Sequence, residues 1–441
     1  MKKVNALSES DFLKALFGFF VVAFLAAALL MPDRGQMLSG LYRIISQPNK
    51  ISTNYFCLGG YAATFLNMGL VAFFCLGLFV IFGATANNVS TLAFLLTLGF
   101  TSWGINVLNM WPSILGVLLY CGVKREKCGA NVNVMLFSTG IAPLITDLMI
   151  RYPNAEAIGF NLEGILIALV VGFFIGFFLP AGLANSPKVH KGFDLYSAAL
   201  PVGMTAFFLN ATLFKTLGVA LPAGADAAQL QVASRLIGNT FCIVVFSLAV
   251  IAALALGCRP RDYMRMLIDP ALVTNFSSTY GNAVFLMNVG VLGLFILGYY
   301  NLIGASFNGV TFGIIFSMLS TCNSGSHPGN VWPIMLGYVV ASTVCGLVSP
   351  LVGGTFTFAV NAQAICVGLC YANGLSPIAD KYGWRYGFLA AVMHYLLVTS
   401  VPTLHGGYCL YNGGFTAAFI CLLLIPILQR FTKTKGEKIS A

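Results

Sequence analysis

Long apolar runs separated by short polar connections are the feature that most constrains how this chain can fold. Only 8% of its 441 residues are charged, whereas a soluble domain carries about 25% charged residues. The runs exceed the roughly ten residues of a transmembrane strand and match the roughly 20 residues of a transmembrane helix. We therefore expect an all-α polytopic membrane protein, and not a disordered, collagen-like or disulfide-rich chain. The expected spans are 12–31, 58–83, 132–149, 158–183 and 195–214 in the first half of the chain, and 237–256, 281–304, 355–375, 386–402 and 410–428 in the second half.

A tandem duplication relates the two halves of the chain. Adding 221 to a position in the first half often returns the same residue, so that Asn109 and Trp111 become Asn330 and Trp332. Roughly a quarter of positions 42–117 are identical to their counterparts without a gap, and a matched Trp-Pro pair does not follow from composition bias. The offset later becomes 234 and then 215, and the expected domains are a first membrane repeat at 10–225, a linker at 226–231, a second membrane repeat at 232–432 and a cytoplasmic tail at 433–441.

Each repeat also contains a pair of apolar segments that are too short to span a membrane. The pairs are 89–103 with 111–122, and 310–321 with 332–347, and the connections between them are rich in Gly, Asn, Ser and Pro. Proline is favoured in the first turn of a helix, so each Trp-Pro should open the second helix of its pair. Non-helical backbone at membrane depth survives only where protein or a watery cavity surrounds it. We therefore interpret each pair as a re-entrant hairpin.

Five spans and one hairpin per repeat give an odd number of crossings, so the second repeat should be inverted relative to the first. The positive-inside rule favours this interpretation with both termini in the cytoplasm of a cell whose inner membrane the chain spans. The expected cytoplasmic segments hold 17 of the 23 Lys and Arg residues. Loop 32–51 is the exception to the rule, because it carries basic residues but lies outside the expected cytoplasmic segments. Counting a hairpin as a full span would make the number of crossings per repeat even, and the inversion would no longer follow. The expected cytoplasmic segments are 1–14, 123–130, 185–192, 257–271, 376–386 and 429–441.

Polar side chains in the two hairpins are the first candidates for a solute site. Half-helix ends present unpaired N–H and C=O groups to a substrate without placing full charges in lipid. The alternative is a satisfied helix break that only packs. We expect both hairpin tips to border one cavity, and we expect Asn-to-Ser variants at the two matched asparagines to reduce transport more than stability. The candidate residues are Asn106, Asn109, Trp111, Asn323, Ser324, Ser326, His327, Asn330 and Trp332.

Two further groups of polar residues are weaker candidates. Asn67 and Asn288 lie within long apolar runs at matched positions, where either a solute or an interhelical hydrogen bond would satisfy the amide. A repeated Gly-x-x-Leu-Tyr stretch could line a pathway, or its tyrosines could lie at the membrane interface among helix-packing glycines. The residues of this stretch are Asp194, Tyr196, Ser197, Tyr411 and Asn412.

The sequence offers no pattern for catalysis, a cofactor or a metal. The 12 cysteines lie mostly in apolar stretches and lack paired CxxC spacing, so we interpret them as small hydrophobic residues. Phosphate-binding loops, HExxH and GxSxG do not occur. The ionisable residues within or near spans (Asp147, Glu163 and His394) are not paired by the duplication, so no proton relay is visible. Basic residues occupy short loops, which argues against a nucleic-acid partner. The expected partners are a small solute and the lipid bilayer, and the sequence does not decide whether the chain forms a homo-oligomer.

The motifs carry a resemblance to known membrane proteins. The repeated G…N-x-WP-x-x-LG block, the TN…G…N-x-G segment and the closing HGGYCLYNGGF resemble a bacterial inner-membrane family that is defined by this duplication and classed as a domain of unknown function. That resemblance covers nearly the whole chain and implies no particular substrate. The layout and the G-x-x-Y-N-G pattern are similar to urea transporters, which implies a small neutral polar solute.

These observations favour a membrane transporter or facilitative channel for a small polar solute, with a pathway between two inverted repeats. The alternative is a Na⁺- or H⁺-coupled secondary carrier of a small organic anion, in which hairpin carbonyls and Asn side chains hold the ion. A membrane-embedded enzyme would need clustered Asp, Glu, His or Lys residues, which the sequence does not show.

Overall fold

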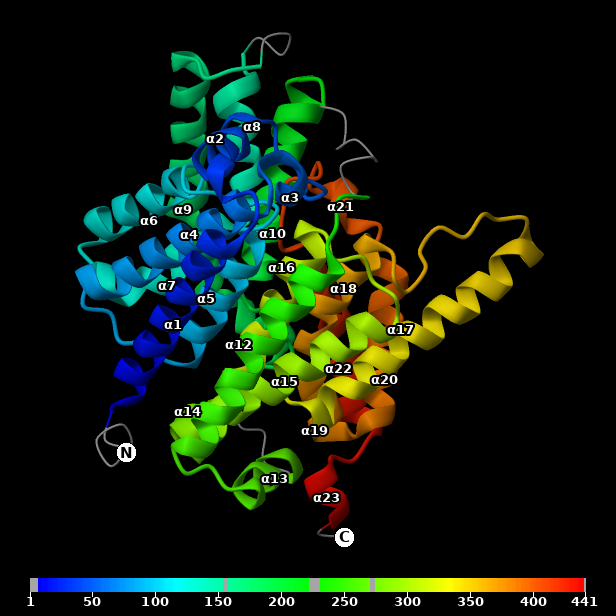
Figure 1. The fold of residues 1–441 in the computed structure, drawn as a ribbon. Helices are drawn as coiled ribbons and strands as arrows, with labels where there is room; N and C mark the ends of the chain where they lie inside the picture. The colour runs from blue at the N-terminus through cyan, green and yellow to red at the C-terminus, as the bar shows by residue number, and fades with distance from the viewer. Residues whose placement is uncertain (1–6, 154–157, 222–230, 270–273, 440–441) are drawn as a thin grey trace.

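The computed structural model describes residues 7–153, 158–221, 231–269 and 274–439, and within these ranges it contains helices and no strand (Figure 1). Eight helical segments of the described chain are long and apolar enough to cross a membrane. The chain is a multi-pass, all-α membrane protein, as its composition predicts. The eight segments are Glu9–Leu30, Tyr61–Ile81, Cys128–Arg151, Leu162–His190, Arg235–Ala255, Asn282–Leu302, Pro328–Val352 and Asn412–Glu437.

Each α-helix described in the first repeat has a counterpart in the same order in the second, which also contains α21 and α23. Helix α1 packs on α4 as α12 packs on α15, and α6 packs on α9 as α17 packs on α20. In the first repeat the helices are α1 (Glu9–Leu30), α2 (Met37–Ser46), α3 (Tyr55–Gly59), α4 (Tyr61–Ile81), α5 (Asn88–Phe100), α6 (Trp111–Lys124), α7 (Val132–Ser138), α8 (Ala142–Arg151), α9 (Leu162–His190) and α10 (Ala199–Asn210). In the second repeat they are α12 (Arg235–Ala255), α13 (Pro260–Ile268), α14 (Phe276–Tyr280), α15 (Asn282–Leu302), α16 (Gly309–Leu319), α17 (Pro328–Val348), α18 (Gln363–Ala372), α19 (Ser376–Tyr382), α20 (Trp384–Val398), α21 (Val401–Leu404), α22 (Asn412–Phe431) and α23 (Lys435–Ile439).

Matched capping residues start the equivalent helices α5 and α16. The Asn87 side chain accepts the backbone N–H of Ser90, and 221 residues later the Asn308 side chain accepts that of Thr311. Both form capping boxes, which satisfy N–H groups that a helix start otherwise leaves unpaired. The duplication therefore preserves the local signal that begins each hairpin.

Equivalent helices of the two repeats run antiparallel. Glu9 at the start of α1 lines the same cavity as Leu256, which follows the end of α12. At the opposite end of the molecule, Asn54 just before α3 donates a hydrogen bond to the carbonyl of Val232 just before α12, at 2.7 Å. In Figure 1 the start of α1 lies at the lower end with α13, α14, α19 and α23, while α2, α3 and α21 lie at the upper end. This arrangement agrees with the inversion that an odd number of crossings predicts.

The repeats meet through an aromatic core and a close helix crossing. Phe24 of α1 stacks on Phe241 of α12 with ring centroids 4.8 Å apart, and Phe316 of α16 lies 5.4 Å from Phe24. Helices α5 and α16 cross where a Cβ on Gly313 would lie only 2.0 Å from the carbonyl oxygen of Gly99. In lipid, such close packing of small residues replaces the hydrophobic effect as the force that joins helices.

Two of the expected spans are not continuous helices. Residues 132–149 form α7 and α8, which a 3-10 turn at Thr139–Ile141 separates. Residues 355–375 begin with extended and turn backbone before α18. Pro143 and Pro377 account for the restarts at α8 and α19, because each lies in a first turn where its missing N–H is tolerated.

The second hairpin also differs from the expectation. Helix α6 of the first hairpin begins at Trp111, as its Trp-Pro pair predicts. Helix α17 begins earlier, at Pro328, because the His327 side chain caps it by accepting the N–H of Gly329 at 3.1 Å. The Trp-Pro pair then lies within the helix, with Pro333 inside, and the helix reaches 21 residues. The second arm is therefore long enough to span a membrane, contrary to the prediction for 332–347.

Candidate functional site

The interrupted segments of the two hairpins are buried polar turns. We call residues 101–110, between α5 and α6, tip 1, and residues 320–327, between α16 and α17, tip 2. The side chains of Trp111 and Trp332 lie nearer the surface. The Trp332 side chain is 39% exposed, and its ring contacts the ring of Trp384. The predicted site residues that are buried in and beside the tips are Asn106, Asn109, Asn323, Ser324, Ser326, His327 and Asn330.

Asn67 and Asn288 hold the two tips with identical hydrogen bonds. The Asn67 amide donates to the carbonyls of Thr101 at 2.7 Å and Ile105 at 2.9 Å. The Asn288 amide donates to the carbonyls at the matched positions 322 and 326, at 2.8 and 2.9 Å. These bonds satisfy carbonyls that the interrupted helices leave free. The structure thus favours the interhelical role over the solute-binding role for this pair.

Asn109 and Asn330 close the same turn in each tip. Their side-chain oxygens accept the backbone N–H of Asn106 at 2.8 Å and of His327 at 3.0 Å. Their amide groups donate to the carbonyls of the matched residues 104 and 325, at 3.0 and 2.8 Å. The amide of Asn109 also donates to Thr146 at 2.9 Å, so the polar atoms of both side chains are used inside the fold. The primary role of the two matched asparagines is therefore to form the turn in each tip.

The two tips lie at opposite ends of the crossed arms and do not meet. Ser102 of tip 1 donates to the carbonyl of Gly309 at the start of α16, at 2.6 Å. Asn323 of tip 2 donates to Thr91 in the first turn of α5, at 3.3 Å. Since α5 has 13 residues, the tips are separated by about 20 Å along it. Each tip therefore packs on the beginning of the other repeat's hairpin, and the expectation of one cavity shared by both tips is wrong.

A charged cluster lies beside tip 1. Asp147 of α8 is fully buried and accepts hydrogen bonds from the Tyr408 hydroxyl at 2.5 Å and the Asn49 N–H at 3.3 Å. Its carboxylate lies 3.5 Å from Arg151 Nε. Burial lowers the pKa of Lys50, whose ammonium lies 5.5 Å from the centre of the Tyr408 ring, and burial raises the pKa of Tyr408. Two cations and one carboxylate thus adjoin this tip.

The repeated Gly-x-x-Leu-Tyr stretches interlock the repeats. The hydroxyl of Tyr196 donates to the carbonyls of Ser317 and Cys370, at 3.1 and 3.0 Å. Tyr411 is also fully buried, 6.2 Å from Tyr371 between ring centroids. Both tyrosines are therefore buried inside the protein and not exposed on its surface. Asn412 lies at the start of α22.

The loops that precede these tyrosines are tied in the same way. The His190 ring is hydrogen-bonded to the Ser197 hydroxyl at 2.8 Å, and the His405 ring to the Asn412 side chain at 2.5 Å. Asp194 lies in the first of these loops, and one of its carboxylate oxygens accepts the N–H of Tyr196 at 2.9 Å. Among the described residues, its other carboxylate oxygen has no hydrogen-bond partner.

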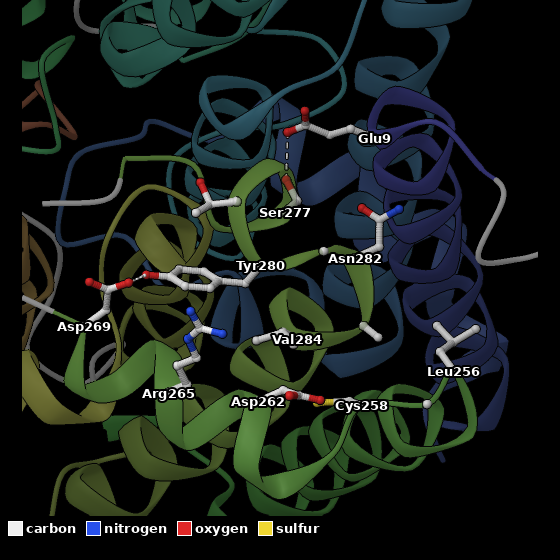
Figure 2. A pocket seen from close by; sticks show the side chains of 14 residues that line it. Glu9, Leu256, Cys258, Asp262, Arg265, Asp269, Ser277, Tyr280, Asn282 and Val284 are labelled. Atoms are coloured by element: carbon white, nitrogen blue, oxygen red, sulfur yellow. Dashed lines mark hydrogen bonds between the residues drawn. The ribbon is translucent and has the colours of Figure 1, made fainter. Parts of the chain in front are cut away.

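A cavity of about 710 Å³ opens beside tip 2 (Figure 2). Ser277 forms part of its wall and connects it to the tip, since its N–H donates to Asn323 at 2.8 Å and its hydroxyl to Glu9 at 2.7 Å. Tyr280 donates to Asp269 at 2.8 Å on the other side, and burial raises the pKa of Tyr280. Figure 2 shows Arg265 and Asp262 below this pair and Asn282 below Glu9.

A second, smaller cavity adjoins tip 1. Its volume is about 150 Å³, and Trp103 of tip 1, Gln363 and Asn412 contribute to its lining. The molecule therefore has a cavity at each end of the α5–α16 crossing: Trp103 of tip 1 lines the smaller one, and Ser277 joins the larger one to Asn323 of tip 2. In the part of the chain that the structure describes, no group of three or more His, Cys, Asp or Glu residues could hold a metal ion, and all 12 cysteines are free.

The sequence marked some of these residues and missed others. Asn67, Asn109 and their counterparts stand out through the duplication. The partnership of Asp147 with Tyr408 has no sequence signal, because 261 residues separate the two. Ser277 and the residues around the larger cavity were also missed, since short polar loops carry no periodic pattern.

Comparison with known families decides the relationship of the chain. Residues 33–215 and 261–430 match the family described as a protein of unknown function, DUF1576. The chain belongs to this family. The two matched regions lie in the two repeats, which confirms the resemblance to a duplicated domain of unknown function. Neither curated proteins nor solved structures give a match.

Proposed function

We propose that this DUF1576 member is a membrane transporter for small polar solutes. The observation that supports this most directly is the antiparallel crossing of two interrupted helices, α5 and α16, with a cavity at each end of the crossing. Inverted repeats with interrupted helices are a recurrent transporter design. The polar tips would then be re-entrant, because protein and watery cavities satisfy their non-helical backbone.

The pathway in this proposal runs from the larger cavity past Ser277 and Asn323 of tip 2, along the crossing, to the smaller cavity at Trp103. In the described conformation the close contact of Gly99 with Gly313 closes the middle. A solute would cross when one tip moves away from the start of the other repeat's hairpin. Hydroxyl and amide groups along this route suit a neutral or zwitterionic solute.

The orientation is part of the proposal. The start of α1, the end of α22 and helix α13 share the end that holds tip 2 (Figure 1). The excess of Lys and Arg in the segments at this end supports a cytoplasmic location for it under the positive-inside rule. The larger cavity would then face the cytoplasm, and the smaller one would face the other side of the membrane.

A second candidate is an ion-coupled carrier of small organic anions. Lys50 and Arg151 beside tip 1 favour it, because two basic side chains and one carboxylate, Asp147, adjoin a half-helix start. Anions are stabilised at such sites by the free N–H groups and the helix dipole.

Reconstituted liposomes test both candidates. Osmotic swelling would be followed by stopped flow with urea, glycerol and glycine, and counterflow would be followed with labelled acetate and succinate. We expect at least one solute to move faster than in protein-free liposomes. Asn282→Trp, which narrows the larger cavity, should reduce that flux several-fold.

The matched control is Leu302→Trp at the far end of the same helix, where the side chain is 85% exposed. This variant should transport like the wild type. The transporter proposal fails if no solute in the panel moves faster than in protein-free liposomes, and the proposed pathway fails if both tryptophan variants transport equally well.

A further inference from the structure

The two tips share the hydrogen bonds that close the turn, and at two positions beside that turn a neutral side chain of the first repeat is replaced by an ionisable one in the second. Asn106 of tip 1 is replaced by His327 in tip 2, at the offset of 221. Thr146, which accepts the Asn109 amide, is replaced by Asp380, at the offset of 234. The duplication therefore supplies an internal comparison: the same turn is built once with neutral partners and once with an imidazole and a carboxylate.

The imidazole and the carboxylate of tip 2 face each other. The Asn330 amide donates to one Asp380 oxygen at 2.5 Å, and the other Asp380 oxygen lies 3.7 Å from His327 Nε2. His327 Nδ1 accepts the N–H of Gly329 at 3.1 Å. Since Nδ1 acts as an acceptor, the ring proton is on Nε2 and points toward Asp380. The fold thus fixes the tautomer of the histidine.

Water can reach this pair although the histidine is nearly buried. The Asp380 side chain is 26% exposed and that of His327 is 6% exposed. Tyr280, which lines the larger cavity, is close enough to Asp380 to interact with it electrostatically. The exposed part of Asp380 therefore gives protons from solvent access to the carboxylate.

Several charged or ionisable groups surround the pair. Lys435 of α23 acts on both members, and Phe276 of α14 lies 6.2 Å from His327 between ring centres. The other nearby ionisable groups are Lys381 beside Asp380 on α19, Tyr280 on α14, Asp269 after α13, Arg265 on α13 and Glu437 on α23.

We propose that His327 and Asp380 form a proton-binding site that loosens tip 2 when it is occupied, so that the proton is the coupling ion of the transport cycle. This coupling role rests on the proposed transport function. Tip 1 has Asn106 and Thr146 at the same positions and therefore lacks this proton site; the carboxylate near it, Asp147, bonds to Tyr408 and Asn49 and not to the asparagine that closes the turn.

The geometry specifies what a bound proton does. On Asp380, it converts the carboxylate into a neutral acid, which accepts the Asn330 amide more weakly and no longer attracts His327 Nε2–H. On His327 Nδ1, it displaces the Gly329 N–H and removes the cap of α17. The first route weakens the bond between Asn330 of α17 and Asp380 of α19, and the second breaks the bond by which His327 of tip 2 caps α17. Acid should therefore loosen tip 2 and leave tip 1 unchanged.

Hydrogen exchange measured by mass spectrometry tests the site without any solute. The purified full chain would be labelled between pH 5 and pH 8, with labelling times scaled to the intrinsic exchange rates. Peptides covering 320–335 and 99–114 would be compared. In the wild type we expect exchange at tip 2 to rise about fivefold at the acid end, which is the effect of losing one ordinary hydrogen bond, while tip 1 stays constant.

The repeat itself provides variants that preserve the turn. His327→Asn with Asp380→Thr rebuilds tip 2 with the partners of tip 1, and this double variant should lose the acid-dependent exchange. Asn106→His with Thr146→Asp should create such exchange in tip 1. Equal pH responses of the two tips in the wild type, or an unchanged response in the double variant of tip 2, would overturn the proton site.

Uptake in liposomes separates this inference from the proposed function. With a solute that moves in the swelling or counterflow assay, an acid-outside gradient should raise initial uptake several-fold in the wild type and not in the His327→Asn, Asp380→Thr variant. If that solute moves at the same rate with and without the gradient, the coupling is wrong and transport stands. If no solute moves under any condition, the transport function and its coupling are both wrong, and the exchange result alone decides whether tip 2 binds a proton.

Discussion

Leu195 in the first repeat donates its backbone N–H to the carbonyl of Gly374 in the second repeat, at 3.0 Å. The relationship is reciprocal, since Leu410 of the second repeat donates to the carbonyl of Gly140 in the first, at 2.8 Å. Each repeat thus donates a hydrogen bond to a carbonyl in the turn between two short helices of the other repeat, α18 and α19 in one case and α7 and α8 in the other. The two repeats cannot separate as rigid halves without losing both bonds. If the chain is the transporter that we propose, we therefore expect its motion to involve the tips and their hairpins.

The crossing of α5 and α16 should tolerate no added side chain at Gly313. A Cβ there would lie 2.0 Å from the carbonyl oxygen of Gly99 and 2.3 Å from the Ser102 hydroxyl. We expect Gly313→Ala to lower the free energy of unfolding by about 1–3 kcal/mol, as overpacking of a tight core does. Thermal unfolding in detergent would measure the change.

The matched control for this prediction is Gly77→Ala in α4, where a Cβ would meet no atom within 4 Å. Alanine is a better helix former than glycine, so this variant should be as stable as the wild type or slightly more stable. Equal melting temperatures for the two alanine variants would show that the repeats do not touch at Gly313.

The duplication made part of the site predictable. Because Asn67 and Asn288 occupy matched positions in apolar runs, the sequence could indicate that both do the same work, and the structure identifies that work as holding the tips. The odd number of crossings likewise predicted antiparallel repeats. Inversion also implies that the two equivalent tips enter from opposite ends of the molecule. The prediction of one cavity bordered by both tips therefore did not follow from the inversion of the repeats.

Other features could not be read from the sequence. The start of α17 depends on a histidine side chain that caps its own helix, whereas Trp-Pro was the stronger local signal. The partnership of Asp147 with Tyr408 joins distant segments of different repeats. The equivalence of Thr146 and Asp380 is hidden by the change of offset from 221 to 234, and it became visible only through their shared contact with the matched asparagines.

The structure reverses the expectation for Asn109→Ser and Asn330→Ser. Serine can accept the backbone N–H, but it is too short to replace the amide donor that reaches Gly104 or Gly325. Asn330→Ser leaves the buried Gly325 carbonyl unpaired, which costs about 1–3 kcal/mol of stability. In Asn109→Ser the Gly104 carbonyl still accepts the Asn49 amide, so the cost there is the loss of the two amide bonds to Gly104 and Thr146. We therefore expect lower melting temperatures for both variants, together with reduced transport. Asn185→Ser on the exposed face of α9 is the control and should unfold like the wild type. Wild-type stability with reduced flux would return both asparagines to the list of solute ligands.

Asp147 should matter to the end of the molecule that holds tip 1. Asp147→Ala would leave the Tyr408 hydroxyl and the Asn49 N–H without their acceptor and would remove the partner of Arg151. Arg151 retains some contact with solvent, so we expect a loss of about 1–3 kcal/mol rather than the larger cost of a fully buried pair. Thermal unfolding of Asp147→Ala beside Glu163→Ala, whose carboxylate is exposed on α9, would measure it. A melting temperature equal to that of the control would mean that the cluster contributes nothing to the fold.

The orientation of the chain can be determined by labelling single introduced cysteines in intact cells. Lys127 follows α6 in the first repeat and Lys381 lies in α19 of the second. The two lysines are therefore not at equivalent positions of the two repeats. Inverted repeats bring both to the end that also holds the start of α1, and the positive-inside rule makes that end cytoplasmic. Lys127→Cys and Lys381→Cys should therefore resist a membrane-impermeant maleimide until the cells are opened.

Gln47→Cys, on the exposed surface after α2 at the other end, should react at once. The native cysteines are buried or half-buried, so the background is expected to be low. Immediate labelling at Lys127→Cys and Lys381→Cys would reverse the orientation, whereas labelling at one of them alone would contradict the antiparallel repeats.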